Sequence, residues 1–178
     1  QKGAGFLALP EALDCFLEEI YSKVKIQISI KTRIGTDCPE EFPRLLEIYN
    51  QYPVSELIIH PRIQKDYYKN TPNLKVFETA LRDSKNPVCY NGDIFTAADY
   101  KKIIDLFPQV KTVMLGRGLI ANPGLAKEIK GGAAAENTQL KAFHDQVYAD
   151  YRTVLSGDRN VLFKMKELWF YMAPKFSD

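Results

Sequence analysis

The sequence lacks several features that would assign it to common protein classes. No apolar run approaches the ~20 residues that a transmembrane helix requires, and no basic segment precedes the short apolar stretch near the N-terminus, as it would in a signal peptide. Its three cysteines, Cys15, Cys38 and Cys89, are widely spaced and form no CxxC pair. This cysteine usage favours a reducing, cytoplasmic setting over a disulfide framework, and no metal site is predicted.

Two other absences narrow the fold and the partners. The net charge of +2 is too small to predict nucleic-acid binding by itself. No GxGxxG follows an apolar segment, which argues against a dinucleotide-binding Rossmann sheet. The hydrophobic content of 46% and the charged content of 26% are those of a globular protein, and 178 residues suffice for one domain plus an appendage.

Four short apolar segments have the pattern of β-strands. In the first, Val24, Ile26, Ile28 and Ile30 alternate with polar residues. The expected strands are residues 24–31, 55–60, 86–90 and 110–115, and the expected helices lie within residues 1–22 and at 40–52, 74–84 and 96–107. The spacing of Thr96 and Asp99 is that of a capping box at the start of the last of these helices.

Polar residues follow the four expected strands at Lys31, His60, Asn91 and Gly116. These positions are roughly 30 residues apart, the length of one βα unit, so the strands should be parallel. Four such units predict an α/β protein, half of a (β/α)8 TIM barrel, with its functional residues at the carboxyl ends of the strands. The half-barrel is expected over residues 1–130. A short α-helical domain, with helices at 140–155 and 161–172, is expected over residues 131–178.

Two glycine-bearing turns at successive strand ends predict a phosphate site. The first is Asn91-Gly92-Asp93, and the second is Gly116-Arg117-Gly118. Backbone N–H groups at such turns suit a dianion, and an arginine can bind it through two N–H groups. The segment therefore points to a nucleotide-type ligand.

Four motifs together resemble the tRNA-dihydrouridine synthases. They are KTRIG at residues 31–35, HPR at 60–62 with Tyr68 eight residues after His60, YNGDI at 90–94 and MLGRGLIANP at 114–123. The resemblance implies a (β/α)8 barrel that holds FMN and a C-terminal helical domain that helps to grip tRNA. It also implies reduction of a uridine to 5,6-dihydrouridine, with NADPH recharging the flavin.

The resemblance assigns roles to individual residues. The expected FMN-binding residues are Lys31, His60, Asn91, Gly92, Asp93, Gly116 and Arg117, and the expected substrate-binding residues are Arg33, Arg62 and Tyr68. Lys31 would stabilise the negative N1–C2=O edge of reduced FMN. Asp93 would contact a ribityl hydroxyl or a backbone amide. The role of Arg62 stays open between the flavin phosphate, RNA and a local salt bridge.

The chain departs from the family pattern at two points. Pro61 stands where the family usually has glycine, which stiffens the turn after His60. The family's catalytic cysteine lies on a strand that would precede position 1, so no catalytic residue is predicted among residues 1–178. The chain alone is expected to bind FMN poorly and to be inactive. A half-barrel exposes strand edges, which favours pairing with a second copy.

Two other functions remain open from the sequence. One is a different phosphate-binding barrel enzyme, such as a flavin dehydrogenase of small molecules or a sugar-phosphate isomerase, which would share the Gly-Arg turn. The other is a non-catalytic RNA-binding or assembly module, which the missing cysteine would favour. The HPR motif with the later Tyr68, together with the helical tail, favours the tRNA enzyme.

Overall fold

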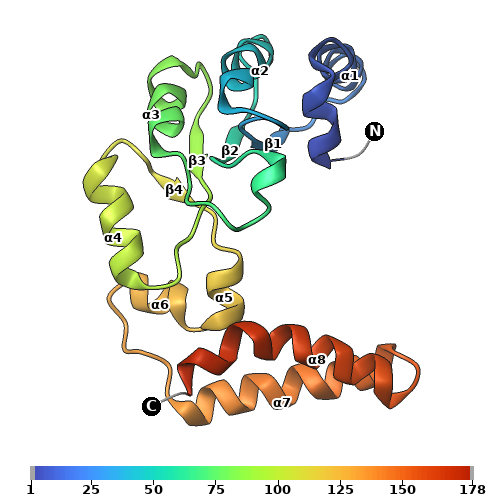
Figure 1. The fold of residues 1–178 in the computed structure, drawn as a ribbon, viewed down its shortest axis with the longest axis vertical. Coiled ribbons are helices and arrows are strands. Elements are labelled where there is room, and N and C mark those ends of the chain that lie inside the picture. Colours follow the sequence, from blue (N-terminus) through green and yellow to red (C-terminus); the bar gives the residue numbers. More distant parts are fainter. Residues whose placement is uncertain (1–2, 177–178) are drawn as a thin grey trace. The chain divides into compact units, whose positions relative to one another are not determined.

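The computed structural model describes residues 3–176, in which strands and helices alternate before the chain becomes wholly helical (Figure 1). Backbone contacts divide the chain into two units. The first comprises the described residues up to Gly92 together with Phe107–Met114, and the second comprises Asp93–Leu106 and the described residues from Leu115 onward. The domain boundary expected near residue 130 stays a prediction.

The first unit contains a four-stranded parallel sheet. Its strands are β1 (Ser29–Arg33), β2 (Glu56–His60), β3 (Val88–Tyr90) and β4 (Thr112–Val113), and they lie in the order of the sequence. The helices between them along the chain are α2 (Phe42–Tyr49), α3 (Leu74–Asp83) and α4 (Ala97–Leu106). The predicted fold class, a partial (β/α)8 barrel with parallel strands, is confirmed.

Helices α2 and α3 cover one face of this sheet (Figure 1). On β1, the Thr32 hydroxyl hydrogen-bonds the Tyr49 hydroxyl of α2 at 2.9 Å, and burial raises the pKa of Tyr49 to about 12. On β3, the rings of Tyr90 and of Phe77 on α3 form a T-shaped pair, with 4.8 Å between centroids. Because side chains alternate along a strand, the residues on either side of Thr32 face away from α2.

The first strand begins later than the alternating pattern predicts. Residues 24–28 are not in a strand, and β1 starts at Ser29 and continues to Arg33. The reason is its partner: β2 starts at Glu56, which pairs with Ser29, so the earlier residues have no ladder to join. Ile26 is accordingly exposed. Lys31 therefore lies in the middle of β1 and not at its end.

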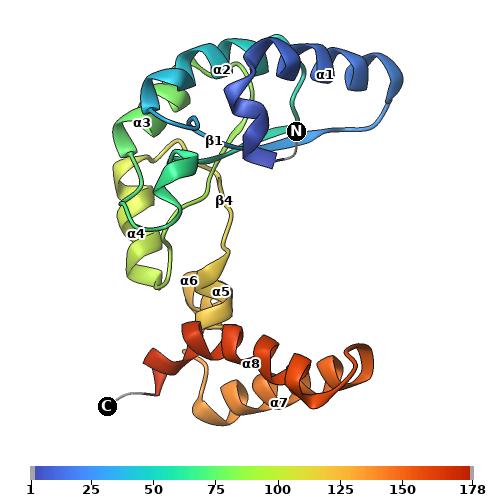
Figure 2. The ribbon, with the colours of Figure 1, turned by 45° about the vertical axis from the view of Figure 1, so that its right-hand side comes forward.

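The remaining elements of the first unit agree with the predicted ones to within a few residues. Before β1 come η1 (Gly3–Ala8) and α1 (Pro10–Lys23), where Figure 2 shows α1 beside α2. A short 3₁₀ turn, η2 (Pro39–Glu41), precedes α2, and another, η3 (Gln64–Asp66), follows β2. The turns η2 and η3 shape the loops that follow β1 and β2, respectively.

The second unit is wholly helical. It contains α4, α5 (Arg117–Ala121), α6 (Leu125–Ile129), α7 (Asn137–Val154), α8 (Asp158–Met172) and η4 (Ala173–Lys175). The capping box at the start of α4 is confirmed, since the Asp99 amide donates to Thr96 Oγ1 and the Thr96 amide donates to Asp99 Oδ2, both at 3.0 Å. In the described part of the chain, no helix is long and apolar enough to span a membrane.

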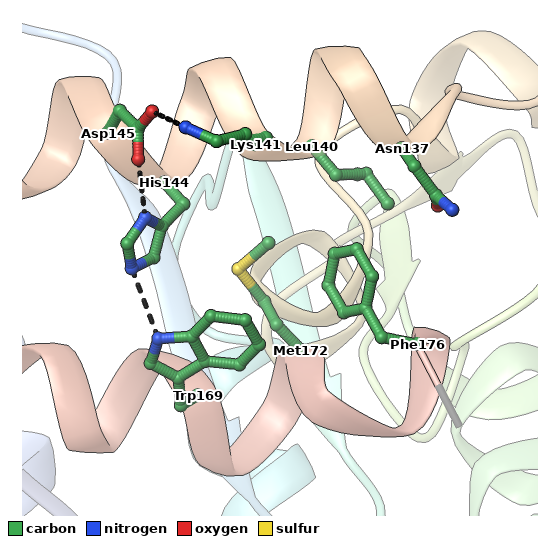
Figure 3. Close-up of a pocket in the computed structure, with 8 residues that line it drawn as sticks. All are labelled: Asn137, Leu140, Lys141, His144, Asp145, Trp169, Met172 and Phe176. Carbon is green, nitrogen blue, oxygen red and sulfur yellow. Dashed lines mark hydrogen bonds and ion pairs between the residues drawn. The ribbon is translucent and has the colours of Figure 1, made fainter.

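A polar chain of side chains joins α7 to α8 (Figure 3). The Trp169 Nε1–H donates to His144 Nε2 at 3.1 Å, and His144 Nδ1 lies 2.9 Å from Asp145 Oδ1. Asp145 in turn pairs with Lys141. Leu140 and Met172 are buried beside this chain, so each helix contributes both apolar packing and hydrogen bonds to the seam.

The loop after β1 is anchored by one carboxylate that the sequence did not single out. Glu41 accepts hydrogen bonds from the amides of Thr36, Asp37 and Cys38 at 2.8–2.9 Å and from the Thr36 hydroxyl at 3.0 Å. Burial opposes ionisation of Glu41, but these hydrogen bonds outweigh it and lower its pKa to about 2.

The Glu41→Gln substitution is expected to lower the free energy of unfolding by about 1–2 kcal/mol at neutral pH, because a neutral amide accepts these bonds less well. The folded-state pKa lies below the ordinary value of 4.5. The contribution is therefore complete above that pH and is lost as the pH falls toward 2. Urea unfolding at neutral pH and near pH ~3 measures both effects. Glu40→Gln is the matched control, and equal stability of the two variants at neutral pH would contradict the prediction.

Candidate functional site

The register of the sheet places the candidate residues in two neighbouring rows on the face opposite α2. Lys31 aligns with Ile58, Cys89 and Thr112 across the four strands. Arg33 aligns with His60, one step nearer the carboxyl ends. In a parallel sheet aligned residues point to the same side, so Lys31, Arg33 and His60 share one face.

Lys31 carries a perturbed ammonium group on this face. Desolvation by the surrounding protein, and then the positive charge of Arg33, lower its pKa from the usual value for lysine, while Cys89 acts weakly in the other direction. Its side chain remains exposed, so the charge is accessible to a ligand. A cation of this kind suits an anionic edge of a planar ligand.

Arg33, Tyr68 and His60 form a stack beside Lys31. The Arg33 guanidinium lies 5.6 Å from the centroid of the Tyr68 ring, and the His60 and Tyr68 rings lie 5.9 Å apart at an interplanar angle of 29°. Arg33 also donates to the carbonyl oxygen of Ile63 at 2.8 Å. The Tyr68 ring is about half exposed, which leaves an aromatic surface next to a cation.

The loop after β2 is tied to the loop after β1. The Ile34 amide donates to the Arg62 carbonyl at 3.2 Å, and the Gln64 amide donates to the Gly35 carbonyl at 2.9 Å. Tyr67, with a φ of 50°, has left-handed backbone that a non-glycine residue rarely adopts. Its carbonyl accepts from Arg33 Nη2 at 3.3 Å. Strained backbone beside Tyr68 is a feature that clusters at functional sites.

His60 and Arg62 are both buried and contact each other. Arg62 Nη1 lies 3.1 Å from His60 Nε2, and Arg62 Nε donates to the carbonyl oxygen of Asn70 at 2.5 Å. Only 2% of Arg62 is exposed, so its guanidinium faces the protein interior. The choice between the flavin phosphate, RNA and a local salt bridge for Arg62 stays a prediction, and its guanidinium forms hydrogen bonds to His60 and Asn70.

Asn91 and Gly92 continue the site at the end of β3. The Asn91 amide donates to the Ile59 carbonyl at 3.0 Å, and Asn91 Nδ2 donates to the Met114 carbonyl at 2.8 Å. A β-carbon at Gly92 would lie 2.8 Å from the Tyr90 hydroxyl oxygen. Asn91 thus links β3 to the end of β4, and only glycine fits the turn without displacing Tyr90.

The second unit contains the other predicted phosphate residues. Arg117 Nη2 donates to Asp93 Oδ1 at 2.6 Å, and the Arg117 guanidinium lies 5.4 Å from the centroid of Phe95. A β-carbon at Gly116 would meet no atom within 4 Å, so there is open space beside that backbone. A phosphate at this turn would share Arg117 with Asp93.

The structure separates sequence-predicted residues into two groups. Lys31, Arg33, His60 and Tyr68 are brought together on one face of the first unit, with Arg62 behind His60 and with Asn91 and Gly92 at the end of β3. Asp93, Gly116 and Arg117 belong to the second unit. No sequence pattern indicated Glu41, Tyr67 or Phe95. Glu41 anchors a loop, Tyr67 has a positive φ and Phe95 lies beside the Arg117 guanidinium, and each of these features depends on the folded structure.

Two of the three cysteines are exposed outside the sheet, and the third is buried within it. Cys15 on α1 and Cys38 in the loop after β1 are exposed. Cys89 lies in the row of Lys31 but is buried, and burial raises the pKa of its thiol. A buried thiol with a raised pKa is a poor nucleophile, which agrees with the prediction that Cys89 is a small core residue.

Two cavities are relevant to ligand binding, one beside β1 and one between α7 and α8. One, of about 660 Å³, lies along the edge of β1 that is not paired with β2, against η1 and α1, and it is bordered by Lys31 and Arg33. The other, of about 390 Å³, lies between α7 and α8 beside Leu140, Trp169 and Met172 (Figure 3). The first falls in the size range of small-molecule sites and adjoins the charged residues.

Comparison with known proteins gives a consistent result. A family model described as "Dihydrouridine synthase (Dus)" matches residues 1–166. A tRNA-dihydrouridine(16) synthase of Pseudomonas putida is 27% identical over 145 residues, which cover 80% of this chain and 45% of that protein. One from Shewanella oneidensis is 30% identical over 152 residues, which cover 81% of this chain and 47% of that protein.

The similarity extends to a differently named relative. The tRNA-dihydrouridine synthase B of Pasteurella multocida is 25% identical over 128 residues, which cover 69% of this chain and 37% of that protein. The chain spans about half the length of the curated relatives it matches.

Proposed function

The chain belongs to the dihydrouridine synthase family, and from this we infer that it forms part of an FMN-dependent enzyme that reduces uridine in tRNA to 5,6-dihydrouridine, with NADPH as electron donor. The observation that carries the proposal is the shared face of Lys31, Arg33 and His60, with the Tyr68 ring stacked beside them. A planar anionic cofactor and a planar base both suit such a face.

The residues present fit FMN on chemical grounds. When bound, FMN supplies hydride for reduction of a carbon–carbon double bond. The accessible ammonium of Lys31 would stabilise the negative edge of the reduced ring system, and His60 would offer a ring nitrogen beside it. Asn91 and Gly92 would hold the ribityl chain. The open backbone at Gly116 and the guanidinium of Arg117 would hold the phosphate, with Asp93 orienting that guanidinium.

Arg33 and Tyr68 would recognise the uracil. A uridine within a folded tRNA must leave its stack to reach a reactive centre, and a ring with a cation beside it offers stacking and hydrogen bonding in return. The guanidinium of Arg33 is already oriented by the carbonyls of Ile63 and Tyr67. This pre-organisation lowers the entropy lost when the base binds.

The helices at residues 131–178 would contact tRNA. We propose the cytoplasm as the compartment in which the protein acts. The names of two of the relatives described make position 16 of tRNA the first to examine. Within residues 3–176, β1 has no strand partner on the edge away from β2, and such an edge favours association of the isolated chain with a second copy. None of Cys15, Cys38 and Cys89 would protonate the uracil, and the isolated chain would bind FMN poorly and be inactive.

Flavin content and NADPH oxidation test this proposal when they are measured on the complete enzyme of which we propose that residues 1–178 form part, and not on the isolated chain. We expect stoichiometric FMN and NADPH oxidation that speeds up when unmodified tRNA is added. Arg117→Met should weaken FMN binding by roughly 10- to 100-fold, because a charge-assisted contact to phosphate is lost. Arg152→Met, on α7, is the control. Binding of FMN to Arg117→Met as tightly as to the wild type would contradict the phosphate assignment.

A further inference from the structure

The Arg62 guanidinium contacts one particular ring nitrogen of His60, Nε2. Arg62 Nη1 lies 3.1 Å from His60 Nε2, and both residues are at most 5% exposed. A guanidinium carries only hydrogen-bond donors and stays protonated in proteins. The partner nitrogen must therefore accept the bond, so His60 Nε2 carries a lone pair and the ring proton lies on Nδ1.

The backbone between the two residues holds this contact in place. The Arg62 amide donates to the His60 carbonyl at 2.7 Å, which closes a three-residue turn around Pro61. Proline fixes its own φ near the value that such a turn requires. On the other side, Arg62 Nε is held by the carbonyl of Asn70. The guanidinium is thus fixed from both directions before any ligand arrives.

We propose that Arg62 is a positioning residue that fixes His60 in its neutral Nδ1–H tautomer, so that His60 presents an N–H donor from Nδ1. Protonating Nε2 would place two donors face to face and add a charge next to Arg62 and near Arg33, which aligns with His60 on β1. The Tyr68 ring stacks on the His60 ring, with 5.9 Å between their centroids. A neutral His60 adds no further positive charge to that of Lys31, Arg33 and Arg62. The use of this N–H toward a flavin rests on the proposed function, whereas the tautomer itself does not.

The second histidine offers an internal control. Within residues 1–178 the histidines are His60 and His144. His144 Nε2 accepts from Trp169 Nε1–H, which is a donor only, so His144 should be the same tautomer for an independent reason. Arg62→Met should therefore change the spectrum of His60 alone, and Trp169→Phe should change that of His144 alone.

Side-chain ¹⁵N NMR of the protein that contains residues 1–178 tests the proposal, with signals assigned by His60→Gln and His144→Gln. We expect a single Nδ1–H pattern for His60 in the wild type, its loss in Arg62→Met, and its retention in Arg62→Lys, which keeps a donor. An Nε2–H pattern in the wild type, or an unchanged His60 pattern in folded Arg62→Met, would overturn it. If Arg62→Met does not fold, the wild-type and Arg62→Lys spectra decide. Because these spectra need no flavin, failure of FMN binding would leave this result readable.

Discussion

The Lys31→Met substitution is expected to lower kcat for uridine reduction by roughly 100-fold or more, because a positioned charge at the site of developing negative charge is removed. The lysine lies on the face of the sheet opposite α2, in the same row as Ile58 and Cys89. Desolvation, and then the charge of Arg33, lower its pKa. Its charge is therefore lost at a lower pH than that of an ordinary lysine. Stopped-flow reoxidation of the reduced flavin by tRNA, measured across alkaline pH, records both the rate and its pH limit.

Two control variants, Lys31→Arg and Lys101→Met, test whether the effect comes from the positive charge at position 31. Lys31→Arg keeps a cation and should retain more activity, with its alkaline limit moved upward. Lys101→Met, on the exposed surface of α4, should behave as the wild type. A kcat for Lys31→Met within a factor of two or so of the wild type would remove Lys31 from the flavin site, as would a wild-type alkaline limit that persists in this variant.

The Gly118→Ala substitution is expected to destabilise the second unit by about 3 kcal/mol or more, the upper range for overpacking. A β-carbon at Gly118 would lie 2.1 Å from the Ile94 carbonyl oxygen and 2.9 Å from Leu125 Cδ2. The Ile94 oxygen is a backbone atom, so this clash can be relieved only by moving the segment before α4 or the start of α5. Chemical denaturation followed by far-UV circular dichroism measures the change.

Gly116→Ala is the matched control two residues earlier in the same motif. Its β-carbon would meet no atom within 4 Å, so the free energy of unfolding should change by less than about 1 kcal/mol. FMN affinity should fall instead, since the open space at Gly116 is proposed for the phosphate. Equal stability of Gly118→Ala and the wild type would show that α5 and the Ile94 segment do not pack as closely as described.

The parallel half-barrel could be predicted because its signals are local and repeated. The separations between Lys31, His60, Asn91 and Gly116 reflect the length of a βα unit, and the capping box at Thr96 depends on two residues three positions apart. The start of β1 could not be predicted this way. Alternation continues back to Val24, but pairing is set by where β2 begins.

The sequence motifs named the residues of the candidate site, but they did not predict which of these residues contact one another. The motifs named Lys31, Arg33 and His60, and the register places them on one face. The sequence left the partner of Arg62 open, because burial and a contact to a residue two positions away depend on how the loop folds back. Likewise, no pattern indicates that Asp93 pairs with Arg117 across 24 residues of chain.

Mass spectrometry of tRNA provides the most direct test of the proposed activity. The protein that contains residues 1–178 would be expressed in cells that lack their own dihydrouridine synthases, beside the Lys31→Met variant at equal abundance. We predict that dihydrouridine appears at a defined tRNA position with the wild type and falls to background with Lys31→Met. Unmodified tRNA in the presence of abundant, folded, FMN-loaded wild-type protein would contradict the proposed function, and so would equal modification by the variant.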